Sequence, residues 1–347
     1  MKNCFIWILV TTSILFMSCD DENDDPITGT FKDGLVVVNQ GPFGSGTATL
    51  TFKQRGSSEV VQDVFSGAND GAFLGNIAQS MIEIGDKNFI SINNGGKVVV
   101  VDKESFALID TIGDISNSRY FATNDNQLYM SSWGPNGIDG GVYELDIETN
   151  EVKEFISIGG GPEGLTFANN QLYIANSGGF LLDSLVLILN PDDNAIIKTL
   201  AVGHNPQLMV SDNNDNVYVI CSGFNDWMDP SNNTPGALVK ISNREIEWSK
   251  EIPNGSNNLT IDLENEFLYY ASEGRVVKLD INNHTAEPTV VSNTFAYALG
   301  FDQEENQLYI ADAKDFSSLG EALIYSVNDE LINSFPTGLI PGYFHFQ

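Results

Sequence analysis

The sequence predicts an all-β fold, a seven-bladed β-propeller, and three observations support this interpretation. An aromatic residue between apolar residues recurs at spacings of 40, 44, 45, 51 and 40, at Phe89, Tyr129, Tyr173, Tyr218, Tyr269 and Tyr309, with a weaker copy at 35–38. A period of about 40–45 residues is typical of four-stranded propeller blades. After residue 34, strand-like runs alternate with Asn, Asp and Gly turns, without any helical period longer than a turn. The two chain ends are also complementary.

Residues 159–202 illustrate one repeat unit. Strand patterns at 163–168, 171–176, 184–189 and 195–202 are separated by two turns and one loop, at 177–183. The same order of strands and turns places further units at about 70–112, 113–158, 203–252, 253–291 and 292–337.

The remaining fragments complete one more unit. The chain from residue 34 begins at a second strand, whereas residues 338–346 form a first strand with nothing after it. We therefore predict that the N- and C-terminal segments pair in one blade and close the ring. Closure removes the long open edges that all-β proteins must otherwise protect.

The first 18 residues have the pattern of a lipoprotein signal peptide. Residues 5–17 are almost wholly apolar but too few to span a bilayer comfortably. Leu15-Phe16-Met17-Ser18-Cys19 resembles a bacterial lipobox, although Phe16 stands where Leu is usual. This resemblance implies lipidation of Cys19; the alternative is an ordinary cleaved signal with a chance cysteine.

Residues 19–33 are expected to form an acidic tether, and residues 34–347 the propeller. The run at 20–26 resembles the export signal of Bacteroidetes lipoproteins that reach the outer face of the outer membrane. We therefore expect an outer-membrane, cell-surface protein that contacts the membrane only through its N-terminal lipid.

Composition limits the partners. The formal net charge of −31 repels phosphate backbones and anionic lipid surfaces, so nucleic acid is not an expected partner. The three cysteines, Cys4, Cys19 and Cys221, offer no disulfide framework once Cys4 leaves with the signal and Cys19 is lipidated. Stability must therefore come from the core.

Propeller geometry predicts where a ligand binds. The loops that enter the first strands and those between second and third strands lie on one face, around the central channel. The second-to-third loops differ greatly in length, as binding loops on a regular scaffold often do. Apolar walls with a few polar groups suit a flat organic ligand, although some aromatics could instead be plugs between blades. The candidate ligand-binding residues are Phe43, Arg119, Tyr120, Trp133, Glu163, Asn176, Phe180, Gln207, Phe224, Trp227, Tyr297, Phe316 and Tyr343.

Catalytic signals are weak. The three histidines are scattered, and the sequence has no zinc-binding His pair, phosphate-cradling Gly loop or nucleophile elbow. We expect no catalytic residue, catalytic cofactor or catalytic metal. One alternative is a calcium site formed by Glu163, Asn205, Asn258 and Asp312, similar to that of gluconolactonase-type propellers.

The N-terminal half resembles a family of Bacteroidetes surface lipoproteins with YncE-like propellers. The run Val38-Asn39-Gln40-Gly41-Pro42-Phe43-Gly44 is similar to the family's opening motif, with Gln40 replacing the usual acid and Pro42 the usual Asn. Segments 74–76, 79–81 and 119–120 also fit. BtuG-type members capture cobalamin for an outer-membrane TonB-dependent transporter.

The resemblance therefore implies a non-enzymatic binding protein with such a transporter as partner, and cobalamin or another corrinoid as the best ligand. Two alternatives stay open. One is a metal-dependent lactonase or hydrolase, and the other is a protein-interaction or adhesion module.

Overall fold

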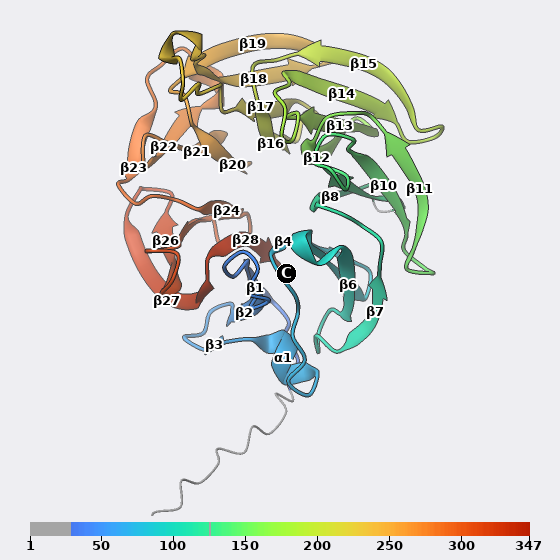
Figure 1. The fold of residues 1–347 in the computed structure, drawn as a ribbon. Helices are drawn as coiled ribbons and strands as arrows, with labels where there is room; N and C mark the ends of the chain where they lie inside the picture. Colours follow the sequence, from blue (N-terminus) through green and yellow to red (C-terminus); the bar gives the residue numbers. More distant parts are fainter. Residues whose placement is uncertain (1–28, 125) are drawn as a thin grey trace, which may run out of the picture.

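The computed structural model describes residues 29–124 and 126–347; Cys19 and the predicted signal peptide lie outside this range. Seven four-stranded antiparallel sheets form a ring (Figure 1). This confirms the seven-bladed β-propeller. Within the described residues, no helix has the length and apolar character that crossing a membrane requires.

Each blade contains four strands, which follow one another from the centre outward. Blade 1 has β28 (Pro341–Phe346), β1 (Gly34–Asn39), β2 (Thr49–Gln54) and β3 (Val60–Val61). Blade 2 has β4 (Ala78–Ile84), β5 (Lys87–Ile92), β6 (Lys97–Asp102) and β7 (Leu108–Ile112). Blade 3 has β8 (Ser118–Thr123), β9 (Leu128–Ser132), β10 (Gly141–Asp146) and β11 (Glu151–Ser157). Blade 4 has β12 (Pro162–Ala168), β13 (Gln171–Asn176), β14 (Leu185–Asn190) and β15 (Ala195–Ala201).

The other three blades repeat this order. Blade 5 has β16 (Pro206–Ser211), β17 (Val217–Cys221), β18 (Gly236–Ser242) and β19 (Glu245–Ile252). Blade 6 has β20 (Asn257–Asp262), β21 (Phe267–Ser272), β22 (Arg275–Asp280) and β23 (Thr289–Ser292). Blade 7 has β24 (Ala298–Asp302), β25 (Gln307–Asp312), β26 (Leu319–Ser326) and β27 (Leu331–Leu339). Short helices are α1 (Val64–Ala68), η1 (Asn93–Gly95), η2 (Pro230–Asn232) and η3 (Ile281–Asn283).

The two ends of the chain pair in blade 1, as predicted. Strand β28 runs antiparallel to β1, with Leu35 opposite Phe346 and Val37 opposite Phe344. The closing strand is shorter than expected, because residues 338 and 339 belong to β27. Ile340 has a left-handed φ of 57°, which ends β27 and turns the chain into β28.

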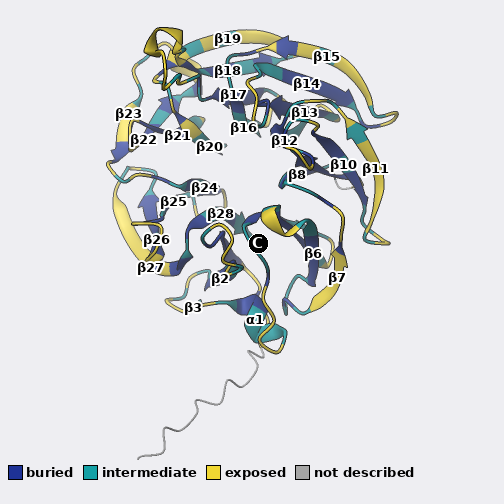
Figure 2. Ribbon diagram, in the orientation of Figure 1, coloured by how far each residue is buried: buried dark blue, intermediate teal, exposed yellow. Residues whose placement is uncertain are grey.

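The repeated aromatic residue and its apolar neighbours form part of the core. The aromatic lies on the second strand of six blades, where Phe89, Tyr129 and Tyr218 are fully buried. These rings pack between neighbouring blades; Tyr269, for example, stacks on Phe301 of blade 7 with ring centroids 5.7 Å apart. Figure 2 shows buried residues mainly on the middle strands of the blades, such as β9, β13 and β17, and exposed ones on the outermost strands. The aromatic therefore recurs once per blade in the sequence because one such ring packs between each pair of these blades.

The last residues of the predicted tether lie against the propeller. Phe31 is buried, with its ring 5.1 Å from that of Phe52 and 5.5 Å from that of Phe106. Lys32 forms an ion pair with Glu104 at 2.8 Å. Within the described residues, packing against the propeller thus starts at Phe31, three residues before β1.

Candidate ligand-binding site

A cavity of about 360 Å³ lies on the face where the inner strands begin. Residues at equivalent positions meet there, because each inner strand starts at this face. The second residue of an inner strand is Gln79 in β4, Arg119 in β8, Glu163 in β12, Gln207 in β16 and Asn258 in β20. This cavity, which we call the mouth, is lined by Gln40, Phe43, Ile77, Gln79, Asn93, Arg119, Tyr120, Gln207, Leu208, Asn257, Asn258, Phe295, Ala296, Tyr297 and Gly342.

Arg119 is fixed by three hydrogen bonds to two neighbours in this ring. Its Nε donates to Glu163 Oε2 at 2.8 Å and its Nη2 donates to Glu163 Oε1 at 3.0 Å. Its Nη1 donates to Gln79 Oε1 at 3.1 Å. The bidentate geometry is the strong form of an Arg–carboxylate pair. One hydrogen-bonded chain therefore links blades 2, 3 and 4.

Aromatic rings surround the guanidinium. The Arg119 Cζ atom lies 4.6 Å from the ring centroid of Trp133 and 5.8 Å from that of Tyr120, within cation–π range. Trp133 meets Phe180 edge-on, with centroids 5.6 Å apart. Residues from β8, β12 and two loops thus form one packed cluster.

Burial sets the protonation states in this cluster. It raises the pKa of the Glu163 carboxyl, and the adjacent Arg119 guanidinium opposes that shift. Burial also raises the pKa of Tyr120 to about 12, so this phenol stays neutral at physiological pH. Among the described residues that line the mouth, Arg119 is the one that carries a charge, and Glu163 neutralises it.

The opposite wall presents amides and aromatics. The Tyr297 hydroxyl donates to Gln40 Oε1 at 2.8 Å, and the Tyr297 ring meets Phe316 edge-on at 5.5 Å. Asn258 Nδ2 donates to the Tyr297 carbonyl oxygen at 3.2 Å. These bonds fix the orientation of the amides. Because Gln40 carries an amide and not a carboxylate, this wall is uncharged.

The structure brings five predicted site residues together at the mouth: Phe43, Arg119, Tyr120, Gln207 and Tyr297. Trp133, Glu163 and Phe316 contact these residues from the surrounding shell, and Phe180 packs against Trp133. Phe295 was missed, although it lies in the segment that enters β24, where a mouth residue is expected. Its side chain is exposed beside the cavity.

Three other predicted residues are not part of the mouth lining. Asn176 is buried and donates through Nδ2 to Asp183 Oδ2 at 2.8 Å. Phe224 and Trp227 lie on the loop between β17 and β18, which Figure 1 draws in yellow at the outer rim near β19. Trp227 is 92% exposed there. Long loops of a propeller can fold outward as well as over the channel, and this one folds outward.

Tyr343 belongs to a deeper cavity of about 260 Å³ within the channel. This cavity shares Tyr120, Leu208, Asn258 and Gly342 with the mouth, so the two adjoin. The rings of Tyr120 and Tyr343 lie 6.4 Å apart at the boundary.

Three of the four oxygen groups considered for calcium have another partner. Glu163 binds Arg119, and Asp312 forms an ion pair with Lys314 at 3.0 Å. Asn205 Oδ1 accepts a hydrogen bond from Gln207 Nε2 at 2.5 Å. Over residues 29–124 and 126–347, no group of three or more His, Cys, Asp or Glu side chains is placed to hold a metal.

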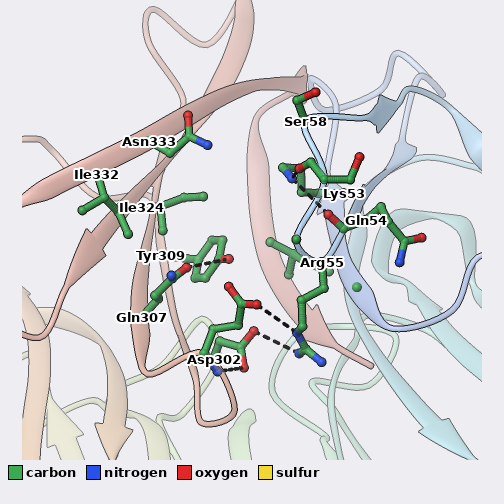
Figure 3. Close-up of a pocket in the computed structure, with 15 residues that line it drawn as sticks. Lys53, Gln54, Arg55, Ser58, Asp302, Gln307, Tyr309, Ile324, Ile332 and Asn333 are labelled. Carbon is green, nitrogen blue, oxygen red and sulfur yellow. Dashed lines mark hydrogen bonds and ion pairs between the residues drawn. The ribbon is translucent and has the colours of Figure 1, made fainter.

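A third cavity, of about 380 Å³, lies at the other end of the strands, between blades 1 and 7 (Figure 3). Arg55 crosses this seam. Its Nη2 lies 3.0 Å from Asp302 Oδ2, and its Nη1 lies 2.7 Å from Asp33 Oδ1 and 2.5 Å from Glu304 Oε2. Arg55 Nη1 also donates to the Gln347 carbonyl oxygen at 3.3 Å. Arg55 and Asp302 both line this cavity, and their ion pair joins blades 1 and 7 at the ring closure.

Solved structures share the fold at low sequence identity. A quinonprotein alcohol dehydrogenase-like protein from Bacteroides thetaiotaomicron is 14% identical with a TM-score of 0.68, covering 91% of this chain and 79% of that one. A putative 6-phosphogluconolactonase from Bacteroides fragilis is 11% identical with a TM-score of 0.67, covering 91% and 98%. A functionally unknown protein from Desulfotomaculum acetoxidans is 11% identical with a TM-score of 0.67, covering 90% and 98%. At these identities the likeness concerns the fold alone.

No curated protein matches the sequence. A family model does match, over residues 33–329, which include most strands of all seven blades. Since the match covers most of the 347 residues, the chain belongs to the family described as a domain of unknown function, DUF5074.

Proposed function

We propose that this protein is a lipid-anchored, cell-surface binding protein that captures a cofactor-like ligand at the mouth, without turnover, for an outer-membrane TonB-dependent transporter. Cobalamin or another corrinoid is the ligand of first choice. The sequence resemblance to BtuG-type lipoproteins motivates this choice, and the composition of the mouth supports it.

The observation that carries the proposal is the combination of aromatic rings with neutral amides around one cavity. Phe43, Tyr120, Phe295 and Tyr297 offer flat apolar surface, and Phe43 is 81% exposed. Gln40, Gln79, Gln207 and Asn258 offer hydrogen bonds without net charge. Corrinoids have a macrocycle bordered by amide groups, so both kinds of contact have a counterpart in the ligand.

The same face has features expected of a docking surface. Large apolar side chains are exposed on its loops, and such clusters mark interaction sites. They comprise Phe73, Phe180, Leu181, Leu182, Trp227, Met228, Phe316 and Leu319. We assign Trp227 and Met228 to transporter contact, because both are almost fully exposed and lie apart from the mouth.

The ligand proposal is tested by titrating the full chain with cobalamin, haem and a ferric siderophore, followed by calorimetry and Trp fluorescence. Replacing Phe43 with Ala should weaken corrinoid binding by about tenfold, because a stacked ring contributes about 0.5–1.5 kcal/mol beyond its buried area. Phe73→Ala is the matched control, since Phe73 is 83% exposed but does not line the mouth. Absence of binding to all three ligands would overturn the capture proposal.

The anchor and the partner are tested separately in cells. Cys19→Ala should release the protein from the outer-membrane fraction, and a variant that still sediments there after a high-salt wash would contradict lipidation. Replacing Trp227 and Met228 with Ser should abolish cross-linking to the transporter while leaving the ligand titration unchanged. If cross-linking to another protein persists without any small ligand, the protein-interaction alternative takes first place.

A further inference from the structure

The cavity between blades 1 and 7, which we call the seam cavity, has no part in the proposed capture of a ligand at the mouth. It holds about 380 Å³, and none of its lining residues also lines the mouth. Figure 3 shows Lys53 and Arg55 of blade 1 on one side of it, and Tyr309 and Ile332 of blade 7 on the other. The first and the last blade of the ring thus each form one wall.

Four charged side chains line the seam cavity, namely Lys53, Arg55, Asp302 and Glu305. Two are cations and two are carboxylates, so their charges cancel. Arg55 and Asp302 neutralise each other, with Nη2 and Oδ2 3.0 Å apart. The charges left to interact with a ligand are therefore those of Lys53 and Glu305.

Lys53 is buried without a close counter-ion. Its side chain belongs to a residue that is only 8% exposed, and its Nζ donates to the carbonyl oxygens of Gln54 and Ser57. The third N–H of the ammonium has no partner among the described residues, whose lysine ion pairs do not include Lys53. Burial lowers the pKa of this ammonium, and the charge of Glu305 opposes that shift. An anionic group beside the third N–H would therefore be stabilised.

Glu305 is the complementary group of the same lining. It lies in the turn between β24 and β25, and its side chain is partly exposed. The described residues give its carboxylate one ionic partner, the Arg55 Nε at 3.9 Å from Oε1, which is too far for a hydrogen bond. The same guanidinium lies closer to Asp33, Asp302 and Glu304. The Glu305 carboxylate can therefore accept hydrogen bonds from a cationic ligand group.

We propose that the seam cavity binds a small zwitterion, an α-amino acid, with its carboxylate at Lys53 and its ammonium group at Glu305. A ligand without net charge matches a lining whose charges cancel, and the net charge of −31 does not repel it as it repels anions. Ile332 of β27 is half-exposed beside the cavity, so an apolar amino-acid side chain has a contact there.

Such a ligand would connect the two blades that close the ring. Lys53 belongs to β2 of blade 1, whereas Glu305 belongs to blade 7. The two binding groups come together only in the closed ring. A ligand that binds the folded chain and not the unfolded one raises stability by mass action. Leucine should therefore raise the unfolding temperature of the full chain.

The test compares L-leucine with two analogues by calorimetric titration into the full chain. Leucinamide lacks the carboxylate and N-acetyl-leucine lacks the ammonium group, while both keep the side chain. Each should bind at least about tenfold more weakly than leucine, because each loses one charge-assisted contact. Absence of binding at millimolar leucine, or equal affinities for the three compounds, would overturn the proposal.

Variants locate the ligand in the seam. Glu305→Gln should weaken leucine binding by about tenfold or more, because the amide carries no charge for the ammonium group. Glu304→Gln is the matched control, since Glu304 is the neighbouring residue and does not line the cavity. Lys53→Met should weaken binding similarly, with Lys240→Met on β18 as its control. If Lys53→Met does not fold, Glu305→Gln decides, and an unchanged leucine affinity in that variant would contradict the site.

The mouth provides the remaining control. Phe43→Ala should leave leucine binding unchanged, because Phe43 does not line the seam cavity. A loss of leucine affinity in this variant would place the amino acid at the mouth and overturn the proposal. If corrinoids bind and leucine does not, only the seam site is wrong. If leucine binds as expected and corrinoids do not, only the corrinoid assignment is wrong.

Discussion

Arg55 Nη2 lies 3.0 Å from Asp302 Oδ2, so an ion pair joins the first blade of the ring to the last. The Asp302 side chain is only 4% exposed and depends on this cation. The same guanidinium reaches Asp33 before β1 and the Gln347 carbonyl oxygen after β28. One side chain thus connects both chain ends and the neighbouring blade.

Arg55→Met should therefore lower the free energy of unfolding by roughly 3 kcal/mol, because it leaves a buried carboxylate without its partner. Urea unfolding followed by circular dichroism measures this loss. Lys198→Met is the control: its pair with Glu245 at 2.6 Å is largely exposed, so the expected loss is below about 1 kcal/mol. Equal losses in the two variants would show that the seam pair has no special role.

Deleting residues 341–347 should open the ring. The deletion removes β28, leaves β1 with an unpaired edge and exposes the core that Phe344 covers. The expected loss is several kcal/mol, comparable to the stability of a whole domain. Thermal unfolding and limited proteolysis measure it, with deletion of the exposed residues 29 and 30 as the control. An unchanged unfolding temperature would contradict closure through β28.

Glu163→Gln should destabilise the mouth by roughly 3 kcal/mol, because the Arg119 charge remains without a carboxylate. Replacing both residues together, Arg119→Met with Glu163→Leu, should restore much of the loss, since no uncompensated charge remains. Urea unfolding of the single and double variants provides the measurement. A double variant that is no more stable than Glu163→Gln would contradict this account.

The same variant changes the pH dependence. Burial raises the pKa of Glu163, so the folded chain keeps this proton to a higher pH than the unfolded chain does. For this group the unfolding free energy therefore falls as pH rises from the ordinary pKa to the raised one. Glu163→Gln should lack that component when unfolding is compared across this interval.

Cys221 should not react in the native protein. Burial raises the pKa of its thiol to about 12, which leaves little thiolate at neutral pH, and the side chain is inaccessible. Iodoacetamide labelling at pH 8, followed by mass spectrometry of the peptide that contains Cys221, should show modification only after denaturant is added. Labelling of native protein at the rate of the unfolded chain would contradict the burial of β17.

Much of the fold could be predicted because the blade repeats. The repeated buried aromatic marks the second strand of six blades, and the incomplete units at the two chain ends predict that these ends pair. The docking of Phe31 on Phe52 and Phe106 could not be predicted, since it depends on contacts between residues far apart in the chain. The start of β28 was placed too early, because sequence patterning does not reveal the left-handed turn at Ile340.

The candidate site was predictable to a similar extent. Arg119 and Glu163 are 44 residues apart, one repeat length, so equivalent positions in successive blades become neighbours. Loop aromatics follow no such rule. Trp227 and Phe43 are both exposed on long connections, and the path of each loop determines that only Phe43 lines the mouth.

The second residues of the inner strands lie at the mouth, apart from the repeated aromatics that pack between blades. Six blades keep the buried aromatic on the second strand, whereas the second residue of the inner strand differs between blades, as in Gln79, Arg119, Glu163 and Asn258. Replacing Gln207 or Asn258 would change a polar group of the mouth without touching that buried aromatic. Arg119 and Glu163 differ from these, because their ion pair also joins blades 3 and 4. The polar lining of the mouth can therefore change at single positions on a scaffold whose core packing lies elsewhere.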